Sequence, residues 1–227
     1  MSINTVRTID NLVPVRHVLI SVSDKNGLEA LIPELIKIGP DIKIFSTGGT
    51  YKKISELLPE AAAANLVPVS DYTGQPETQG GLVKTLDFKI YLGLLTETHN
   101  EAHQSDLART GAVPIDMVIV NLYPFQQTVA QPDVTIEAAR GNIDIGGPCM
   151  IRAAAKNFIR VASVVDPADY PLILDELRST KGKTTLETRA MLAKKAFAHT
   201  AEYDAGITEY LKTCSIDEIK QAYPDIR

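Results

Sequence analysis

Apolar and polar positions alternate along the first third of the chain in a way that predicts strands followed by helices. Residues Val15–Val22 form an apolar run typical of a buried strand, and Leu28–Ile38 carries apolar residues at helical spacing. The pattern then repeats with a strand at Ile42–Phe45, a helical stripe from Tyr51 to Leu58 and a short strand at Leu66–Val69. Strand, polar turn, helix and strand in succession predict a parallel sheet with helices on its faces.

The rest of the chain adds strands and then changes to helices. Two more strands are predicted at Val113–Val120 and Val161–Val165, and helices at Pro171–Arg178 and Leu186–Leu211. We therefore expect an α/β fold with a mostly parallel sheet, helices on both faces and a C-terminal helical extension. The expected domain covers residues 16–211, including the C-terminal helices from about 186, with tails at 1–15 and 212–227.

Composition narrows the class of protein. The chain has 227 residues and a formal net charge of −5, a balance that argues against general affinity for nucleic acids or membranes. It has neither an apolar run long enough to cross a bilayer nor the apolar core of a signal peptide, so we expect a soluble cytoplasmic protein. Cys149 and Cys214 are too far apart for a metal motif, although one disulfide stays possible, and His99 with His103 lacks a third ligand. No metal site is expected.

Two polar turns follow consecutive predicted strands, where parallel sheets bind ligands. The turn Ser21–Lys25 brings a lysine, and the turn Ser46–Thr50 brings hydroxyl groups and two glycines before a helix. Together they predict a phosphate site made of backbone N–H groups, hydroxyls and a cation. The alternative is that Gly48–Gly49 only makes a tight turn and Thr50 only caps a helix. Nucleoside triphosphate and dinucleotide motifs are both missing.

Three further segments carry candidate chemistry. Residues 71–89 form a long polar stretch with Lys84, which could equally be an ordinary surface lysine. Tyr123 follows a predicted strand and could be a functional or only a packing tyrosine. Asp144 precedes two glycines and a helical pattern containing Lys156, so the two could form an acid–base pair or a structural ion pair. If they pair, the lysine should lower the pKa of Asp144.

Eight motifs occur in an order that resembles a known family: SVSDK (21–25), STGGT (46–50), SDYTG-PE (70–77), VKTL (83–86), NLYPF (121–125), NIDIGGP (142–148), RAAAKN (152–157) and KAFAHTAEYD (195–204). From about residue 16 to 211 the chain resembles the IMP cyclohydrolase domain of the bifunctional AICAR transformylase/IMP cyclohydrolase family. The resemblance implies a methylglyoxal-synthase-like fold. It also implies closure of 5-formamidoimidazole-4-carboxamide ribotide (FAICAR) to inosine 5′-monophosphate (IMP) with loss of water, the last step of purine biosynthesis, without a cofactor.

The same resemblance implies roles for individual residues. Lys84 and Tyr123 would stabilise the oxyanion, and Asp144 with Lys156 would move protons at the carboxamide. The residues expected around the phosphate and ribose are Ser23, Lys25, Ser46, Gly48, Gly49, Thr50, Lys84 and Thr85, and those expected along the base are Asn121, Asp144 and Gly146.

The chain departs from the family in one motif and in length. Where the family reads GRVKTLHP, Leu82 replaces the arginine and Asp87–Phe88 replaces the His–Pro pair. Losing a cation and gaining a carboxylate should weaken anion binding if both face the ligand. The transformylase domain is not part of the sequence, so the chain is either a stand-alone cyclohydrolase with a separate AICAR formyltransferase or a piece of a longer bifunctional enzyme. The family also suggests a possible homodimer. Two other functions remain open, a methylglyoxal-synthase-like lyase of triose phosphates and a purine-nucleotide-binding module with weakened or lost catalysis.

Overall fold

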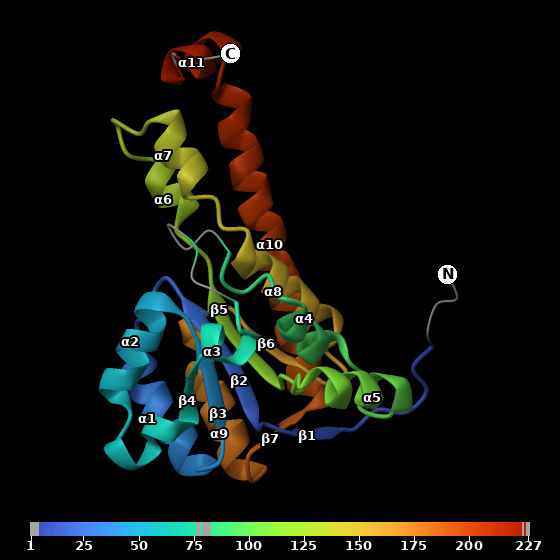
Figure 1. Ribbon diagram of the computed structural model, residues 1–227. Coiled ribbons are helices and arrows are strands. Elements are labelled where there is room, and N and C mark those ends of the chain that lie inside the picture. The colour runs from blue at the N-terminus through green and yellow to red at the C-terminus, as the bar shows by residue number, and fades with distance from the viewer. Residues whose placement is uncertain (1–4, 76–77, 79–82, 224, 226–227) are drawn as a thin grey trace.

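A five-stranded sheet, entirely parallel in its pairings, forms the centre of the computed structural model, which describes residues 5–75, 78, 83–223 and 225 (Figure 1). Its strands stand in the order β4-β3-β2-β5-β6. They are β2 His17–Val22, β3 Lys43–Ser46, β4 Leu66–Pro68, β5 Met117–Asn121 and β6 Ala162–Val164. The predicted α/β class with a parallel sheet is therefore confirmed.

Helices cover both faces of this sheet. The helices of the described residues are α1 Leu28–Ile38, α2 Gly48–Leu57, α3 Val69–Thr73, α4 Phe88–Leu95, α5 Glu101–Thr110, α6 Phe125–Val129, α7 Ile136–Gly141, α8 Gly146–Lys156, α9 Tyr170–Ser179, α10 Leu186–Thr213 and α11 Ile216–Ala222, with short 3₁₀ turns at Glu60–Asn65 and Pro167–Asp169. Of these, α7 and α11 lie beyond the sheet (Figure 1). Four of these, α1, α2, α9 and α10, follow the predicted helical stripes closely. Helices α4 to α7 had no matching sequence prediction.

Strand alternation divides the interior into two apolar layers. Val18 and Ile20 of β2 point into the layer formed with α1 and α9, while Leu19 points into the layer formed with α4 and α8. All three side chains are fully buried. Because successive β2 residues face opposite layers, the strand is apolar throughout, as its sequence pattern indicates.

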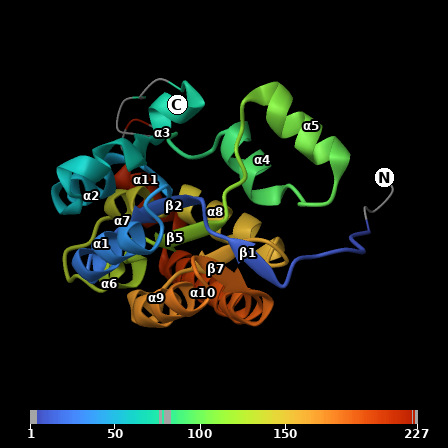
Figure 2. The same cartoon turned by 90° about the horizontal axis from the view of Figure 1, so that it is seen from below.

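The N-terminal segment is fastened to the domain by a second, two-stranded sheet. Strand β1 (Leu12–Pro14) pairs antiparallel with β7 (Lys183–Thr185), and Figure 2 shows the pair below the main sheet. The guanidinium of Arg189, completely buried, donates to the backbone carbonyls of Asp10, Asn11, Phe158, Ile159 and Thr184. The range expected to be an N-terminal tail thus contains a strand, and the range expected to be a C-terminal tail contains α11.

Helix α10 is 28 residues long and reaches well past the sheet (Figure 1). Its first half packs on β6 and α8, and its second half packs on α6, while α11 packs against α7. None of the helices in the described ranges is both long and apolar enough to cross a membrane. Cys149 and Cys214 are free thiols, so the disulfide left open by the sequence is not formed.

Candidate active site

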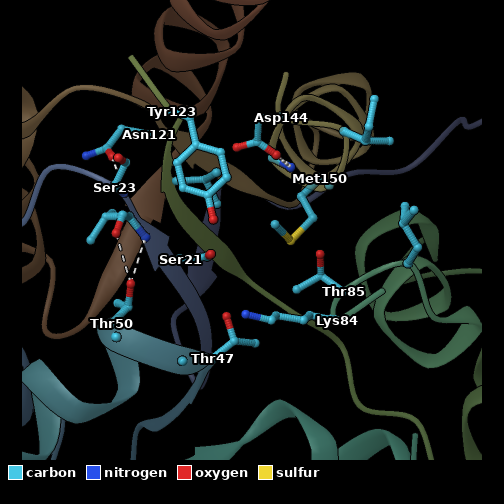
Figure 3. Close-up of a pocket in the computed structure, with 18 of the residues that line it drawn as sticks. Ser21, Ser23, Thr47, Thr50, Lys84, Thr85, Asn121, Tyr123, Asp144 and Met150 are labelled. Atoms are coloured by element: carbon cyan, nitrogen blue, oxygen red, sulfur yellow. Dashed lines mark hydrogen bonds between the residues drawn. The ribbon is translucent and has the colours of Figure 1, made fainter. Parts of the chain in front are cut away.

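A cavity of about 540 Å³ opens at the carboxyl ends of β2, β3 and β5 (Figure 3). This is the edge where open parallel sheets bind their ligands. Most of the residues expected to form the site line it: Ser23, Lys25, Gly48, Gly49, Thr50, Lys84, Thr85, Asn121, Tyr123, Asp144 and Gly146. The structure thus brings together residues of all five polar segments that the sequence singled out. Two expected residues, Ser46 and Lys156, do not line the cavity.

The N-terminus of α2 forms one end of the cavity. Gly48 has a φ of 50°, a left-handed conformation that favours glycine, and the Thr47 side chain caps no N–H of the helix. A Cβ atom at position 48 would lie 3.5 Å from Lys84 Nζ, and one at position 49 would lie 4.0 Å from Lys25 Nζ. Two ammonium groups therefore flank the first turn of α2, whose free backbone N–H groups carry partial positive charge. This end of the cavity is suited to an anion.

Two of the expected phosphate-binding hydroxyls hold the chain instead. Thr50 Oγ1 accepts from Val22 N at 3.1 Å and donates to Val22 O at 3.0 Å, which fixes α2 to the end of β2. Ser46 is fully buried and its Oγ donates to Ile20 O at 2.8 Å. Ser21 and Thr47, which the sequence analysis included in these turns without assigning them a role, also line the cavity.

Asn121 holds the turn that carries Lys25. Its Oδ1 accepts from the backbone N–H groups of Ser23 at 2.6 Å and Asp24 at 2.9 Å, and its Nδ2 donates to Asp24 O at 2.8 Å (Figure 3). With both ends of the amide bonded to the turn, the side chain shapes the cavity wall. The resemblance implied a base contact for Asn121, and the structure shows a turn support.

The carboxyl of Asp144 lies at the opposite end of the cavity, in front of α8. It accepts from Gly147 N at 2.8 Å and from the backbone N–H of Tyr123. A Cβ atom at position 147 would lie 2.6 Å from Asp144 Oδ2 and 2.6 Å from Leu122 Cδ2, so glycine is required there for the carboxyl to approach. Burial raises the pKa of Asp144, and the two N–H donors act in the other direction.

Lys156 does not pair with Asp144. The lysine is the last residue of α8 and Asp144 precedes its first turn, so about 15 Å of helix separates them. Lys156 is also exposed to solvent. The expectation that a lysine lowers the pKa of Asp144 is contradicted, because burial dominates and the pKa is raised.

Apolar side chains form the wall between these two ends. Ile143, Ile145 and Met150 line the cavity beside Asp144, and Tyr123 is 51% exposed with its ring directed into the open space (Figure 3). The cavity thus combines a cationic end at α2, a carboxyl at α8 and, between them, the Tyr123 ring and Met150 together with the hydroxyls of Ser21 and Thr85. Such an arrangement fits a planar heteroaromatic group attached to a phosphate.

The altered motif is only partly described. Leu82 lies outside the described residues. Asp87 is buried and is the N-cap of α4, where its Oδ1 accepts from Lys89 N at 2.8 Å. It does not line the cavity, whereas Val83 and Leu86 do. The carboxylate that was expected to repel an anion therefore faces the backbone of a helix.

The fold and the cavity define an α/β domain with a cavity suited to a small anion at the carboxyl edge of its sheet. Comparison with known families agrees. Residues 27–149 match the model of the MGS-like domain, and residues 154–226 match that of the AICARFT/IMPCHase bienzyme. The chain therefore belongs to the MGS-like domain family.

Individual relatives support this placement. The chain is 48% identical over 204 residues to the bifunctional purine biosynthesis protein PurH of Chlorobium phaeobacteroides, covering 90% of this chain and 38% of the relative. It is 45% identical over 210 residues to PurH of Anoxybacillus flavithermus, covering 92% and 39%. The solved structure of ForH superposes with a TM-score of 0.73 at 34% identity, covering 86% of this chain and 98% of that one. The chain spans about two fifths of the length of the two PurH relatives.

Proposed function

We propose that this domain is an IMP cyclohydrolase that closes the imidazole-carboxamide ribotide FAICAR to IMP and water. One observation carries the proposal: the half-buried carboxyl of Asp144 and an anion site at the N-terminus of α2 lie at opposite ends of one cavity, with Tyr123 and Met150 between them (Figure 3). The similarity to PurH proteins over nine tenths of the chain supports it. The placement of Asp144 and the anion site at opposite ends of the cavity suits a substrate that carries its reacting group at one end and its phosphate at the other.

The chemistry follows from what the substrate needs. The carboxamide nitrogen attacks the formyl carbon, a C–N bond forms, and the nitrogen gives up a proton to Asp144. The formyl oxygen becomes an oxyanion, which Lys84 and the Tyr123 hydroxyl stabilise as donors. That oxygen then takes two protons, the one that Asp144 accepted and one from the formamide nitrogen. Its bond to carbon breaks as a C=N bond forms to that nitrogen, so the atoms of FAICAR are divided between IMP and one water molecule. A raised pKa makes Asp144 a stronger base than a free carboxylate once it is ionised.

Incubation of the protein with FAICAR, followed by absorbance and by chromatography of the product, tests the proposal. We expect IMP at a rate far above that of the uncatalysed reaction, and no methylglyoxal from a triose phosphate. Tight binding of IMP by calorimetry without turnover would instead favour the nucleotide-binding module. Absence of both would remove the proposal.

The setting of this activity is proposed on the same grounds. The PurH relatives are more than twice as long as the matched region, so the formyl transfer that makes FAICAR is assigned to an AICAR formyltransferase outside the described domain. A cytoplasmic location and a homodimer are proposed with it. Size-exclusion chromatography with light scattering tests the dimer.

Replacing Lys25 by Ala is expected to raise the KM for FAICAR about tenfold, with a smaller change in kcat. The reason is that Lys25 Nζ stands beside Gly49 at the anion end, and a phosphate held there is bound equally in the ground and transition states. Steady-state kinetics measures both constants. Lys52→Ala is the matched control, because Lys52 is an exposed lysine of α2, the helix whose N-terminus forms the anion end. An unchanged KM in Lys25→Ala would remove the lysine from the anion site.

A further inference from the structure

Tyr203 lies in the second half of α10 and contacts the segment that carries Asp144. Its Oη accepts from the backbone N–H of Asp144 at 2.8 Å and donates to Asn142 O at 3.4 Å. The Tyr203 side chain is buried, and burial raises its pKa, so the hydroxyl keeps the proton that it donates. One phenol group thus bonds to both sides of Ile143 in the loop between α7 and α8.

The same tyrosine contacts the other functional segment through its ring. The Tyr203 ring meets the buried Phe125 edge-to-face, with centroids 6.3 Å apart and an interplanar angle of 68°. Phe125 begins α6, and its N–H donates to Tyr123 O at 2.8 Å, so the ring supports the turn that bears the Tyr123 side chain. Tyr123 and Asp144 are therefore both positioned from α10.

The packing around this contact leaves little freedom. The Gln126 side chain lies so close to Gly206 that any Cβ there would overlap its amide nitrogen. Tyr210, one heptad beyond Tyr203 on the same helix face, also meets the Phe125 ring edge-to-face, at 5.8 Å and 83°. The α6–α10 contact is thus rigid, and Tyr203 is the member of it whose hydroxyl bonds to the Asp144 segment.

From these contacts we infer that Tyr203 is a positioning residue for the reaction, acting through Asp144 by holding the backbone of residues 142–144 against α10. The expected effect on kcat rests on the proposed function, whereas the expected effect on the position of the Asp144 carboxyl does not. Tyr203 does not line the cavity, so it acts on the reaction only through the groups that do. No part of the argument requires Tyr203 to touch the substrate.

Tyr203→Phe removes the hydroxyl and keeps the ring, and Tyr210→Phe is the matched control at the same Phe125 contact. The charged and titratable groups that face this contact are Asp204, which acts on Tyr203 from the same helix, and Tyr123 and Lys84, which line the cavity with Asp144. Neither substitution removes a charge at neutral pH, because burial raises the pKa of both Tyr203 and Tyr210. Any change in the titration of Asp144 therefore reports the position of the carboxyl.

The first readout is the titration of the Asp144 carboxyl carbon by NMR in the ligand-free protein. Burial is what raises the pKa of Asp144, so a segment released from α10 should gain solvent. We expect its pKa to fall toward that of an ordinary aspartate in Tyr203→Phe and to stay unchanged in Tyr210→Phe. The midpoint of urea unfolding should be similar in the two variants. An unchanged Asp144 pKa in a folded Tyr203→Phe protein would overturn the inference.

The second readout is kinetic. In Tyr203→Phe, kcat for FAICAR should fall about tenfold because the hydroxyl's two hydrogen bonds to the Asp144 segment are lost, while KM changes less than about twofold because the anion end is untouched. Adding Tyr203→Phe to Asp144→Asn should lower kcat no further. A full tenfold additional loss in the double variant would overturn the inference, since Tyr203 would then act independently of Asp144.

The two proposals fail in different ways. If the wild-type protein does not form IMP, the proposed function is lost, and the NMR titration still tests the positioning role. If Tyr203→Phe does not fold, hydrogen exchange in the wild-type protein takes its place. The Asp144 amide, bonded to Tyr203 Oη, should then be protected from exchange, and rapid exchange of that amide would overturn the inference.

Discussion

Replacing Asp144 by Asn is expected to lower kcat for FAICAR by about 10²-fold or more, because the variant has no base for the carboxamide proton. The substitution keeps the shape of the side chain, and its carbonyl oxygen can still accept from Gly147 N. KM should change little, since the phosphate is held at the α2 end of the cavity. Asp204→Asn is the control, because it removes an exposed carboxylate one residue beyond Tyr203. A kcat within threefold of wild type in Asp144→Asn would move the base elsewhere.

The pH dependence of this variant follows from the direction of the pKa shift. Burial raises the pKa of Asp144 in the folded state, so the unfolded chain ionises the group more easily. The carboxylate therefore costs stability, and that cost appears as pH rises from the unfolded pKa through the folded pKa. At neutral pH Asp144→Asn should be at least as stable as wild type by urea unfolding. In the wild type, kcat should rise with pH through a midpoint above that of an ordinary aspartate.

The largest expected loss of stability comes from a buried ion pair at the other edge of the sheet. Arg160 donates to Asp116 Oδ1 at 3.1 Å, and Asp116 Oδ2 accepts from the backbone N–H groups of Arg16 at 2.8 Å and His17 at 3.0 Å. Both side chains are buried. Burial raises the pKa of Asp116, while Arg160 and the two N–H donors act in the other direction.

Asp116→Ala is expected to lower the free energy of unfolding by about 3–5 kcal/mol, because it leaves a buried guanidinium without its counter-charge and two N–H groups without an acceptor. Urea denaturation measures the loss, and Asp116→Asn serves if the alanine variant does not fold. The control is Asp106→Ala, which breaks an exposed pair with Arg109 and should cost less than about 1 kcal/mol. Equal losses in the two alanine variants would contradict the structural role of the buried pair.

The elements that the sequence predicted well are those with one clear periodicity. Helix α1 has all its buried side chains on one stripe, Leu28, Leu31, Ile32, Leu35 and Ile36, and its bounds agree with the prediction. Helix α4 is apolar over nearly its whole length, and in α5 only Leu107 is buried, so neither shows a stripe. These helices depend on tertiary contacts that a local pattern does not contain.

The sequence predicted which segments form the candidate site better than it predicted which side chains of those segments line it. Motif position identifies the turns that meet at the sheet edge, but not which hydroxyl points outward. Ser46 pairs with Ile20 in the parallel ladder and faces the interior, while Ser21, the next residue of β2, faces the cavity. Lys156 was misplaced for a similar reason, because a helix that begins directly after Asp144 carries its last residue away from the carboxyl.

The two ends of the cavity are supported by different parts of the molecule. The α2 end is attached to the central strands through Thr50 and Asn121, whereas the Asp144 end is attached to the distal half of α10 through Tyr203. We therefore expect the two ends to open as separate cooperative units in hydrogen exchange. A ligand that spans the cavity joins them, and its binding free energy then opposes every opening of either unit. Bound ligand should therefore slow amide exchange in α6, α7 and distal α10, well beyond the residues that it touches.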